Sequence, residues 1–515
     1  MREKLEQRWV SLSDALRSQV KNFVVQTIMN GTGKTRHVAA QVVAKIGGIE
    51  VPRNMWPELL DALVNTIREG VDVDAESALL TALGYLGEEL DERYVEQDQI
   101  NRILEVVVGG LQEEKPMSIR RAAIAALNNM LEFVNANFAE GRESERDSII
   151  GAICLSAECP DHDCRLVAFE AIANLAALHY VHIGSWIERL YTLTSAAVER
   201  CESERDVALM SLEFWMQVAE TELKIAEGEE EGPCLDIIKD AADYVIPMFC
   251  NLLTMHDPDE DPDEDEEEPI PVMASGCLRL VCLIEKSRVM DRVMGFVMEN
   301  FNHSDWRIRE AATMALGCIV EGTESEPEAL APKLGEAFGP LMQRLSPGET
   351  MESHPHVRDT TAWVVANIIL YHFRAIDAGL FEPTVQCLQT ALDDVPRVAS
   401  EITFCLHNLA ISAKDAGSME SNAFSPYVGS TLNALLRAYD RADSDKKNLR
   451  VGVHEAIGGI IEHCPDDCLG VLDDFLPHML QRTRQSFGIH AATETQRNVK
   501  DAVLVRPFLS IICFF

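Results

Sequence analysis

Basic residues are scarce in this 515-residue sequence, which has 45 Lys and Arg against 84 Asp and Glu and so a net charge of −39. Binding to nucleic-acid phosphates requires a basic face, so this balance argues against direct nucleic-acid binding. It favours basic partners, which an acidic surface attracts through solution. The hydrophobic share of 47% is too high for a disordered chain and supplies ample material for a core.

Long apolar runs are also missing, since none reaches the roughly 20 residues that a membrane helix needs. The longest candidate, residues 502–515, is interrupted by Arg506 and Pro507. Residues 1–30 lack the charged, apolar and small-residue order of a signal peptide. Most of the 14 cysteines lie in apolar helical stretches, which is typical of reduced core thiols. We therefore expect an intracellular protein without membrane insertion.

Motifs for catalysis or metal binding are incomplete. Residues 31–35 (GTGKT) resemble a phosphate-binding loop, but Ile28 stands where the full pattern needs Gly. Residues 159–164 (CPDHDC) and 463–468 (HCPDDC) contain candidate zinc ligands without the paired spacing of a zinc site. No Ser/His/Asp or Cys/His set can be assigned to one pocket. The sequence therefore predicts no enzyme and no catalytic, cofactor or metal site.

A recurring pattern dominates the sequence instead. A basic residue is followed by small and apolar residues at helical spacing, as in residues 120–127 (RRAAIAAL) and 309–316 (REAATMAL). Copies start at residues 36, 76, 120, 165, 205, 271, 309, 358, 397 and 450, the copies at 76 and 271 being weaker. Eight of the nine intervals lie between 38 and 53 residues, which is the period of HEAT or armadillo repeats.

The repeats predict the fold class and the domain organisation. Each copy is expected to contribute a helix pair with one buried face, and Asp or Pro often precedes the second helix, as at Asp161, Asp305 and Pro396. We predict an all-α, right-handed HEAT/armadillo-type helical-repeat solenoid. Roughly ten to eleven repeats are expected over residues 1–484, followed by a divergent or truncated tail at residues 485–515.

An acidic insertion interrupts the longest interval between copies. Ten of the twelve residues at 257–268 are acidic and the other two are proline, which excludes a helical core. Pro262 also stands where a calcium-binding loop requires Gly. The insertion is either a solvated surface loop or an electrostatic arm for a basic partner, and we favour the arm. Its acidic residues are Asp257, Asp259, Glu260, Asp261, Asp263, Glu264, Asp265, Glu266, Glu267 and Glu268.

Several segments resemble the importin beta family of nuclear import receptors (karyopherins). The similarity runs in order from about residue 7 to about residue 480. It is carried by residues 53–59 (RNMWPEL), 131–138 (LEFVNANF), 305–309 (DWRIR), 359–363 (DTTAW) and 396–400 (PRVAS).

The resemblance implies a nuclear transport receptor of the cytoplasm and nucleus, including the nuclear pore. Such a receptor binds basic nuclear localisation signals, or the importin-beta-binding domain of importin alpha. It also interacts with Phe-Gly nucleoporins, and the GTP form of the small GTPase Ran regulates it, partly through the acidic loop. The alternative is a HEAT-repeat structural scaffold subunit without transport activity, which explains the repeats equally well.

The resemblance also implies site residues, although packing between repeats explains apolar residues equally well. Ser148 replaces a family aromatic in the first Phe-Gly slot, which makes that slot shallower. The family continues by about one repeat before this chain and by several beyond residue 480. The implied Phe-Gly sites are Leu104, Val108 and Ile149 in one slot and Trp186 in a second, and the implied basic-helix contacts are Trp363 and Phe404.

Overall fold

The computed structural model describes residues 2–256, 270–418, 420–475 and 477. Within these residues the regular elements are α-helices and short 3₁₀-helices, without a β-strand. The chain divides into two compact units, residues 1–237 and 238–515. The predicted all-α helical-repeat fold is confirmed.

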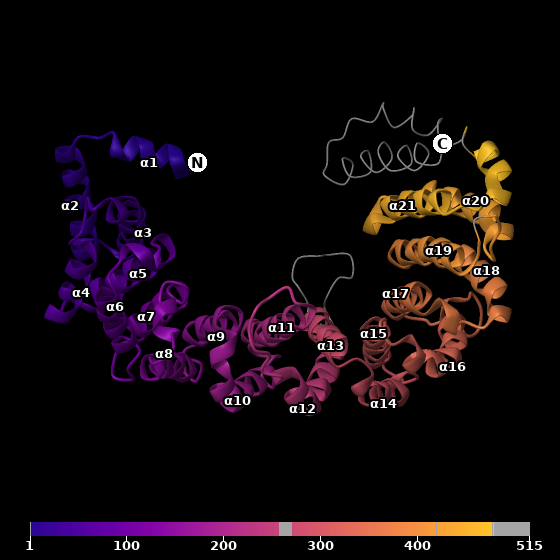
Figure 1. The fold of residues 1–515 in the computed structure, drawn as a ribbon, viewed down its shortest axis with the longest axis horizontal. Coiled ribbons are helices and arrows are strands. Elements are labelled where there is room, and N and C mark those ends of the chain that lie inside the picture. Colours follow the sequence, from indigo (N-terminus) through magenta and orange to yellow (C-terminus); the bar gives the residue numbers. More distant parts are fainter. Residues whose placement is uncertain (1, 257–269, 419, 476, 478–515) are drawn as a thin grey trace. The chain divides into compact units, whose positions relative to one another are not determined.

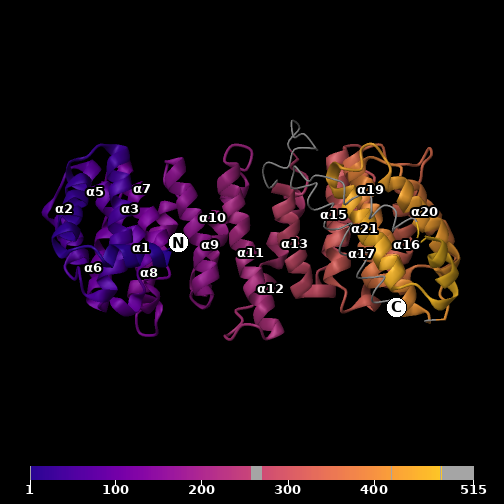
Figure 2. The ribbon, with the colours of Figure 1, turned by 90° about the horizontal axis from the view of Figure 1, so that it is seen from above.

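The first unit begins with α1 (Arg2–Val10) and continues with helix pairs whose members stack in two rows (Figure 1). The first row holds α2 (Asp14–Asn30), α4 (Leu59–Glu69), α6 (Gln97–Gly109), α8 (Glu143–Ser156) and α10 (Ile187–Val198). The second row holds α3 (Gly33–Glu50), α5 (Val73–Glu89), α7 (Met117–Asn129), α9 (His162–Ile183) and α11 (Arg205–Glu227). Figure 2 shows α9 and α11 side by side in the second row.

The second unit repeats this arrangement. Its first row holds α12 (Ile237–Leu252), α14 (Met290–Asn300), α16 (Pro327–Leu345), α18 (Phe381–Ala391) and α20 (Val428–Tyr439). Its second row holds α13 (Ile270–Glu285), α15 (Trp306–Gly322), α17 (Pro355–His372), α19 (Pro396–Ala416) and α21 (Leu449–Glu462). In both units, neighbouring second-row helices pack along much of their length, whereas neighbouring first-row helices touch at few points. Grooves therefore remain between first-row helices.

The repeat pattern of the sequence marks the second row. Each of the ten predicted starts falls within the first four residues of a second-row helix. Asp72, Asp161 and Asp305 are the N-cap residues of α5, α9 and α15, and each side chain accepts a hydrogen bond from a backbone N–H two or three residues further on. Capping satisfies a backbone donor that has no partner inside the helix, so these helices begin where the acidic residues stand.

The recurring arginine links several repeats to the one that follows. Arg358 on α17 donates from Nε and Nη2 to the two carboxylate oxygens of Asp394, which precedes α19, at 2.7 Å each. A planar guanidinium and a carboxylate form such a two-point contact with little freedom. The same link joins Arg36 to Asp72, Arg165 to Glu204 and Arg309 to Glu352.

The core explains two further features of the sequence. Among the described cysteines all except Cys234 and Cys387 are buried. One described helical stretch, His162–Val198, could cross a membrane by length and composition, but 56% of its most apolar window is buried in the protein. Its helix α9 packs against α7 and α11. Packing within the array therefore accounts for its apolar composition.

Candidate functional site

The two aromatic residues expected to contact a basic helix lie on neighbouring second-row helices of the second unit. Trp363 is half-buried on α17, and its ring lies against α15 where a Cβ on Gly317 would come within 1.9 Å of its Cζ3. The missing side chain at Gly317 therefore lets the indole lie on α15. Phe404 on α19 is 42% exposed. Their role in binding stays a prediction.

A carboxylate accompanies each aromatic residue. Asp359 stands four residues before Trp363, and Glu401 stands three residues before Phe404, so each pair shares one helix face. Arg397, near the start of α19, donates from Nε to Oδ2 of Asp359. Carboxylates and aromatic faces are the groups that attract Lys and Arg side chains. The second row thus presents two matched acidic and aromatic pairs on adjacent helices.

Burial and neighbouring charges set the pKa values of these two carboxyl groups. Burial raises the pKa of Asp359, and Arg397 opposes that shift. Burial and then the charge of Asp359 raise the pKa of Glu401 to about 7, while Arg397 lowers it. Lys447 also lowers the pKa of Asp359, whereas Arg397 is the cation that lowers that of Glu401, which still holds its proton up to about pH 7. An incoming cation would favour the ionised form of both groups.

A groove of about 500 Å³ continues this surface between α19 and α21. Phe404 lines it together with Glu455 and Glu462 of α21. Its walls approach closely, because a Cβ on Gly459 would lie 2.2 Å from Nδ1 of His407. The groove therefore combines an exposed aromatic ring with two further carboxylates.

The first Phe-Gly slot corresponds to a groove between the first-row helices α6 and α8. The groove measures about 820 Å³ and is lined by Leu104 and Val108 of α6 and by Ile149 of α8. Leu104 and Ile149 are buried, so they form its floor. Ser148 also lines it, and Leu155 stands at its edge with 65% of the residue exposed. The sequence analysis missed Leu155, whose signal is an apolar residue outside the buried stripe of α8.

Trp186 is not among the residues that line this groove, although it contacts Asp147 and Gly151, which do. It ends the short 3₁₀-helix η4 (Gly184–Trp186) that precedes α10. Its indole Nε1 donates to Oδ1 of Asp147 at 3.1 Å, and its ring reaches α8 at Gly151. Trp186 therefore packs between α8 and α10, and the structure brings together the other three residues only.

Two of the segments predicted from the sequence lie outside the part of the chain that the structure describes. They are the acidic loop at 257–268 and the tail at 485–515. In the part of the chain that is described, no group of three or more His, Cys, Asp or Glu side chains is placed to hold a metal ion. The sequence analysis missed Asp359 and Glu401 as site residues, although their spacing from the aromatic residues was visible.

The chain is similar to known proteins over most of its length. It is 30% identical over 487 residues to importin subunit beta-1 of Arabidopsis thaliana, covering 92% of this chain and 54% of that protein. The crystal structure of importin beta in an ammonium sulfate condition superimposes with a TM-score of 0.86 at 29% identity, covering 99% of this chain and 60% of that one. The chain is therefore similar to importin beta proteins over most of its own length.

Further matches agree with this similarity to importin beta proteins. Importin subunit beta-1 of Schizosaccharomyces pombe is 29% identical over 493 residues, which cover 93% of this chain and 55% of that protein. The structure named Kap95:Nup1 complex is 25% identical with a TM-score of 0.82, covering 99% of this chain and 60% of that one. The family model for importin subunit beta-1-like TPR repeats matches residues 383–504, and a HEAT repeat matches 293–323. The chain spans about half the length of the curated relatives it matches.

Proposed function

We propose that this chain is a nuclear transport receptor that binds a basic nuclear localisation signal, or the importin-beta-binding domain of importin alpha, on the second row of its second unit. The observation that carries this proposal is the pairing of Asp359 with Trp363 and of Glu401 with Phe404 on adjacent helices. A helical ligand would place Lys or Arg against the carboxylates and their aliphatic stems against the rings. Glu455 extends the acidic surface toward α21.

Passage through the pore would use the first row. The groove between α6 and α8 offers an apolar floor wide enough for a Phe side chain, and Trp186 supplies a second contact beyond α8. Small apolar slots bind weakly and release quickly, which suits repeated contacts with Phe-Gly nucleoporins. The relative named in complex with Nup1 supports this assignment.

The remaining parts of the proposal follow from the family. Ran-GTP would act through the acidic loop at 257–268 and release the basic ligand. The chain would occupy the cytoplasm, the nucleus and the nuclear pore. A transport receptor needs no catalytic residues, in agreement with the expectation that the chain is no enzyme. The importin beta relatives do not favour the alternative of a scaffold subunit without transport activity.

Two peptides and two variants test the proposal. The full chain is titrated with a fluorescent importin-beta-binding helix and, separately, with a Phe-Gly repeat peptide, both by anisotropy. Trp363→Ala should weaken only the basic helix, and Leu155→Glu should weaken only the Phe-Gly peptide. Leu178→Glu, at a 47% exposed position of α9, is the matched control for an added surface carboxylate. Absence of binding to both peptides by the folded parent chain would contradict the proposal.

A further inference from the structure

A third groove lies between the first-row helices α14 and α16, in the second unit. It measures about 920 Å³. One wall consists of Met294, Val297 and Met298 of α14, and Met351 joins them from the loop before α17. Met298 is 78% exposed, so its side chain is available to a partner. Methionine side chains are flexible and polarisable, and they adapt to differently shaped apolar ligands.

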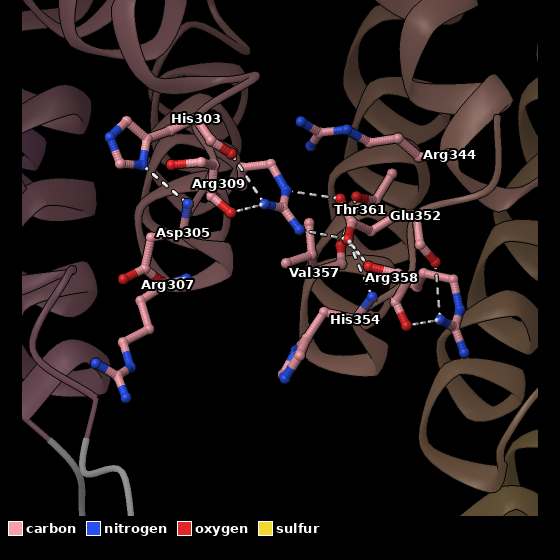
Figure 3. A network of polar contacts seen from close by, with 12 residues as sticks. His303, Asp305, Arg307, Arg309, Arg344, Glu352, His354, Val357, Arg358 and Thr361 are labelled. Atoms are coloured by element: carbon pink, nitrogen blue, oxygen red, sulfur yellow. Dashed lines mark hydrogen bonds and ion pairs between the residues drawn. The ribbon is translucent and has the colours of Figure 1, made fainter.

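The other end of the groove contains an imbalance of buried charge. Arg309 donates to both carboxylate oxygens of Glu352, at 2.8 Å from Nε and 2.7 Å from Nη2 (Figure 3). Arg344 reaches from α16 toward this pair. The side chains of Arg309 and Glu352 are 14% and 7% exposed, and Arg344 is 7% exposed. Glu352 is paired with Arg309 and not with Arg344, so these three buried groups together carry a net charge of +1.

The contacts of Arg344 do not neutralise its charge. Its Nη1 donates to Oγ1 of Thr313 at 2.9 Å, and its Nη2 donates to the backbone oxygen of Phe301. Among the described residues no carboxylate lies within ion-pair distance of Arg344. Burial, together with the nearby charge of Arg309, lowers the pKa of Arg344 to about 10, although Glu352 opposes the shift. A buried charge without a contacting counter-charge is costly.

Stacking fixes the orientation of this guanidinium. Its Cζ lies 3.5 Å from the centre of the Phe301 ring. A guanidinium that stacks on a ring keeps its N–H donors in its own plane, where they can meet a carboxylate edge-on. Arg344 is also among the residues that line the groove. Its remaining donors are therefore placed for a ligand carboxylate that enters between α14 and α16.

We infer that this groove binds a peptide segment in which an acidic side chain stands next to large apolar side chains. The carboxylate pairs with Arg344, and the apolar side chains lie against the methionine wall. A Glu side chain suits the recess because its methylene groups reach inward while the peptide backbone stays outside. The ligand differs from the basic helix and the Phe-Gly repeat of the proposed function.

Three peptides on the full chain test the chemistry of the ligand. The first has one Glu between leucines, with acetylated and amidated ends and a fluorescent label. The second has Gln in place of Glu, and the third is the Gln peptide with a free terminal carboxylate. Because hydrogen bonds to charged groups contribute more than neutral ones, the Glu peptide should bind at least about tenfold more tightly than either other peptide. The inference is overturned if the Gln peptide binds as tightly as the Glu peptide, or if a free terminal carboxylate restores that affinity to the Gln peptide.

Two variants locate the site. Arg344→Met removes the charge and keeps much of the volume, and it should abolish the preference for Glu over Gln. Met298→Glu, at an exposed position that tolerates substitution, should repel the Glu peptide and keeps the inference testable if the first variant does not fold. Leu155→Glu adds the same charge to the groove between α6 and α8 and should leave this peptide's affinity unchanged.

The outcome is independent of the proposed function. Both variants in the α14–α16 groove should bind the basic helix and the Phe-Gly peptide like the parent chain, because Trp363 and Leu155 lie elsewhere. An unchanged preference for Glu over Gln in Arg344→Met, or unchanged affinity of the Glu peptide in Met298→Glu, overturns the inference even when the transport ligands bind. A neutral Phe-Gly peptide competing for this groove with the affinity of the Glu peptide overturns it too.

Discussion

The raised pKa of Glu401 makes the proposed binding of a basic helix dependent on pH. With a pKa of about 7, the carboxyl is about one tenth ionised at pH 6 and about nine tenths ionised at pH 8. A cation favours the ionised form, so binding releases a proton and strengthens as the pH rises. If only the ionised form binds, the affinity should increase about tenfold between pH 6 and pH 8, which is about 1.4 kcal/mol.

The assay is anisotropy titration of the basic helix at half-unit pH steps, with Glu401→Gln and His407→Gln as a matched pair. His407 is the control position because it lies in the same groove as Phe404. The slope should therefore vanish in Glu401→Gln and persist in His407→Gln. A flat profile in the parent chain, or a slope that survives in Glu401→Gln, would refute the reasoning.

The same shift predicts a stability effect without any ligand. The folded state holds the Glu401 proton up to pH 7, whereas the unfolded carboxyl loses it near its ordinary pKa of 4.5. The folded state therefore binds more protons between these values, and stability falls as the pH rises through this window. Glu401→Gln should raise the urea midpoint at pH 8, with an upper limit of about 3 kcal/mol from the shift. No gain at pH 8 would show that the raised pKa is wrong.

Three other predictions use separate parts of the chain. Asp394→Asn leaves Arg358 buried without a counter-charge and should destabilise α17 and α19 by about 3 kcal/mol, measured by hydrogen exchange; protection equal to the parent would contradict this. Burial lowers the pKa of His356 to about 4, so acidification from pH 6.5 toward 4 should destabilise the second unit, and His356→Gln should reduce that loss in melting scans. Replacing the acidic residues at 257–268 by Ser should weaken Ran-GTP or basic-ligand binding and flatten its salt dependence, with a nearly unchanged melting temperature; a large drop in that temperature would make the loop structural.

The sequence was sufficient to predict the helix pairs because each second-row helix repeats one local pattern. An arginine, small residues and apolar residues at 3.6 spacing all lie within eight positions, as at residues 309–316. The reason for the arginine was not visible, since Arg309 meets Glu352 43 residues later, beyond α16 and in the loop before α17. Burial of both partners makes that contact part of the fold rather than of the surface.

The candidate sites were only partly predictable. Trp363 and Phe404 could be selected from the family resemblance, and Leu104, Val108 and Ile149 meet in one groove as expected. The excess of carboxylates over cations at Asp359 and Glu401 could not be predicted, because it depends on how many cations contact each carboxylate in the fold. Arg397 serves Asp359 across 38 residues, and no local pattern shows that Glu401 lacks a partner of its own. The same argument applies to the missing counter-charge of Arg344.

The contributions of the acidic loop at 257–268 and of the Asp359–Glu401 cluster to binding can be measured separately, because their negative charges lie in different parts of the chain. Each arginine link between repeats joins one cation to one carboxylate, so the links add nothing to the net charge of −39. The loop at 257–268 alone supplies ten acidic residues of that excess. Salt screens solvated charges strongly and buried charges weakly. If the loop is solvated as its sequence predicts, its removal should change the salt dependence and leave the pH dependence, whereas Glu401→Gln should do the reverse. One variant that altered both would place the loop and the Asp359–Glu401 cluster in a single electrostatic site.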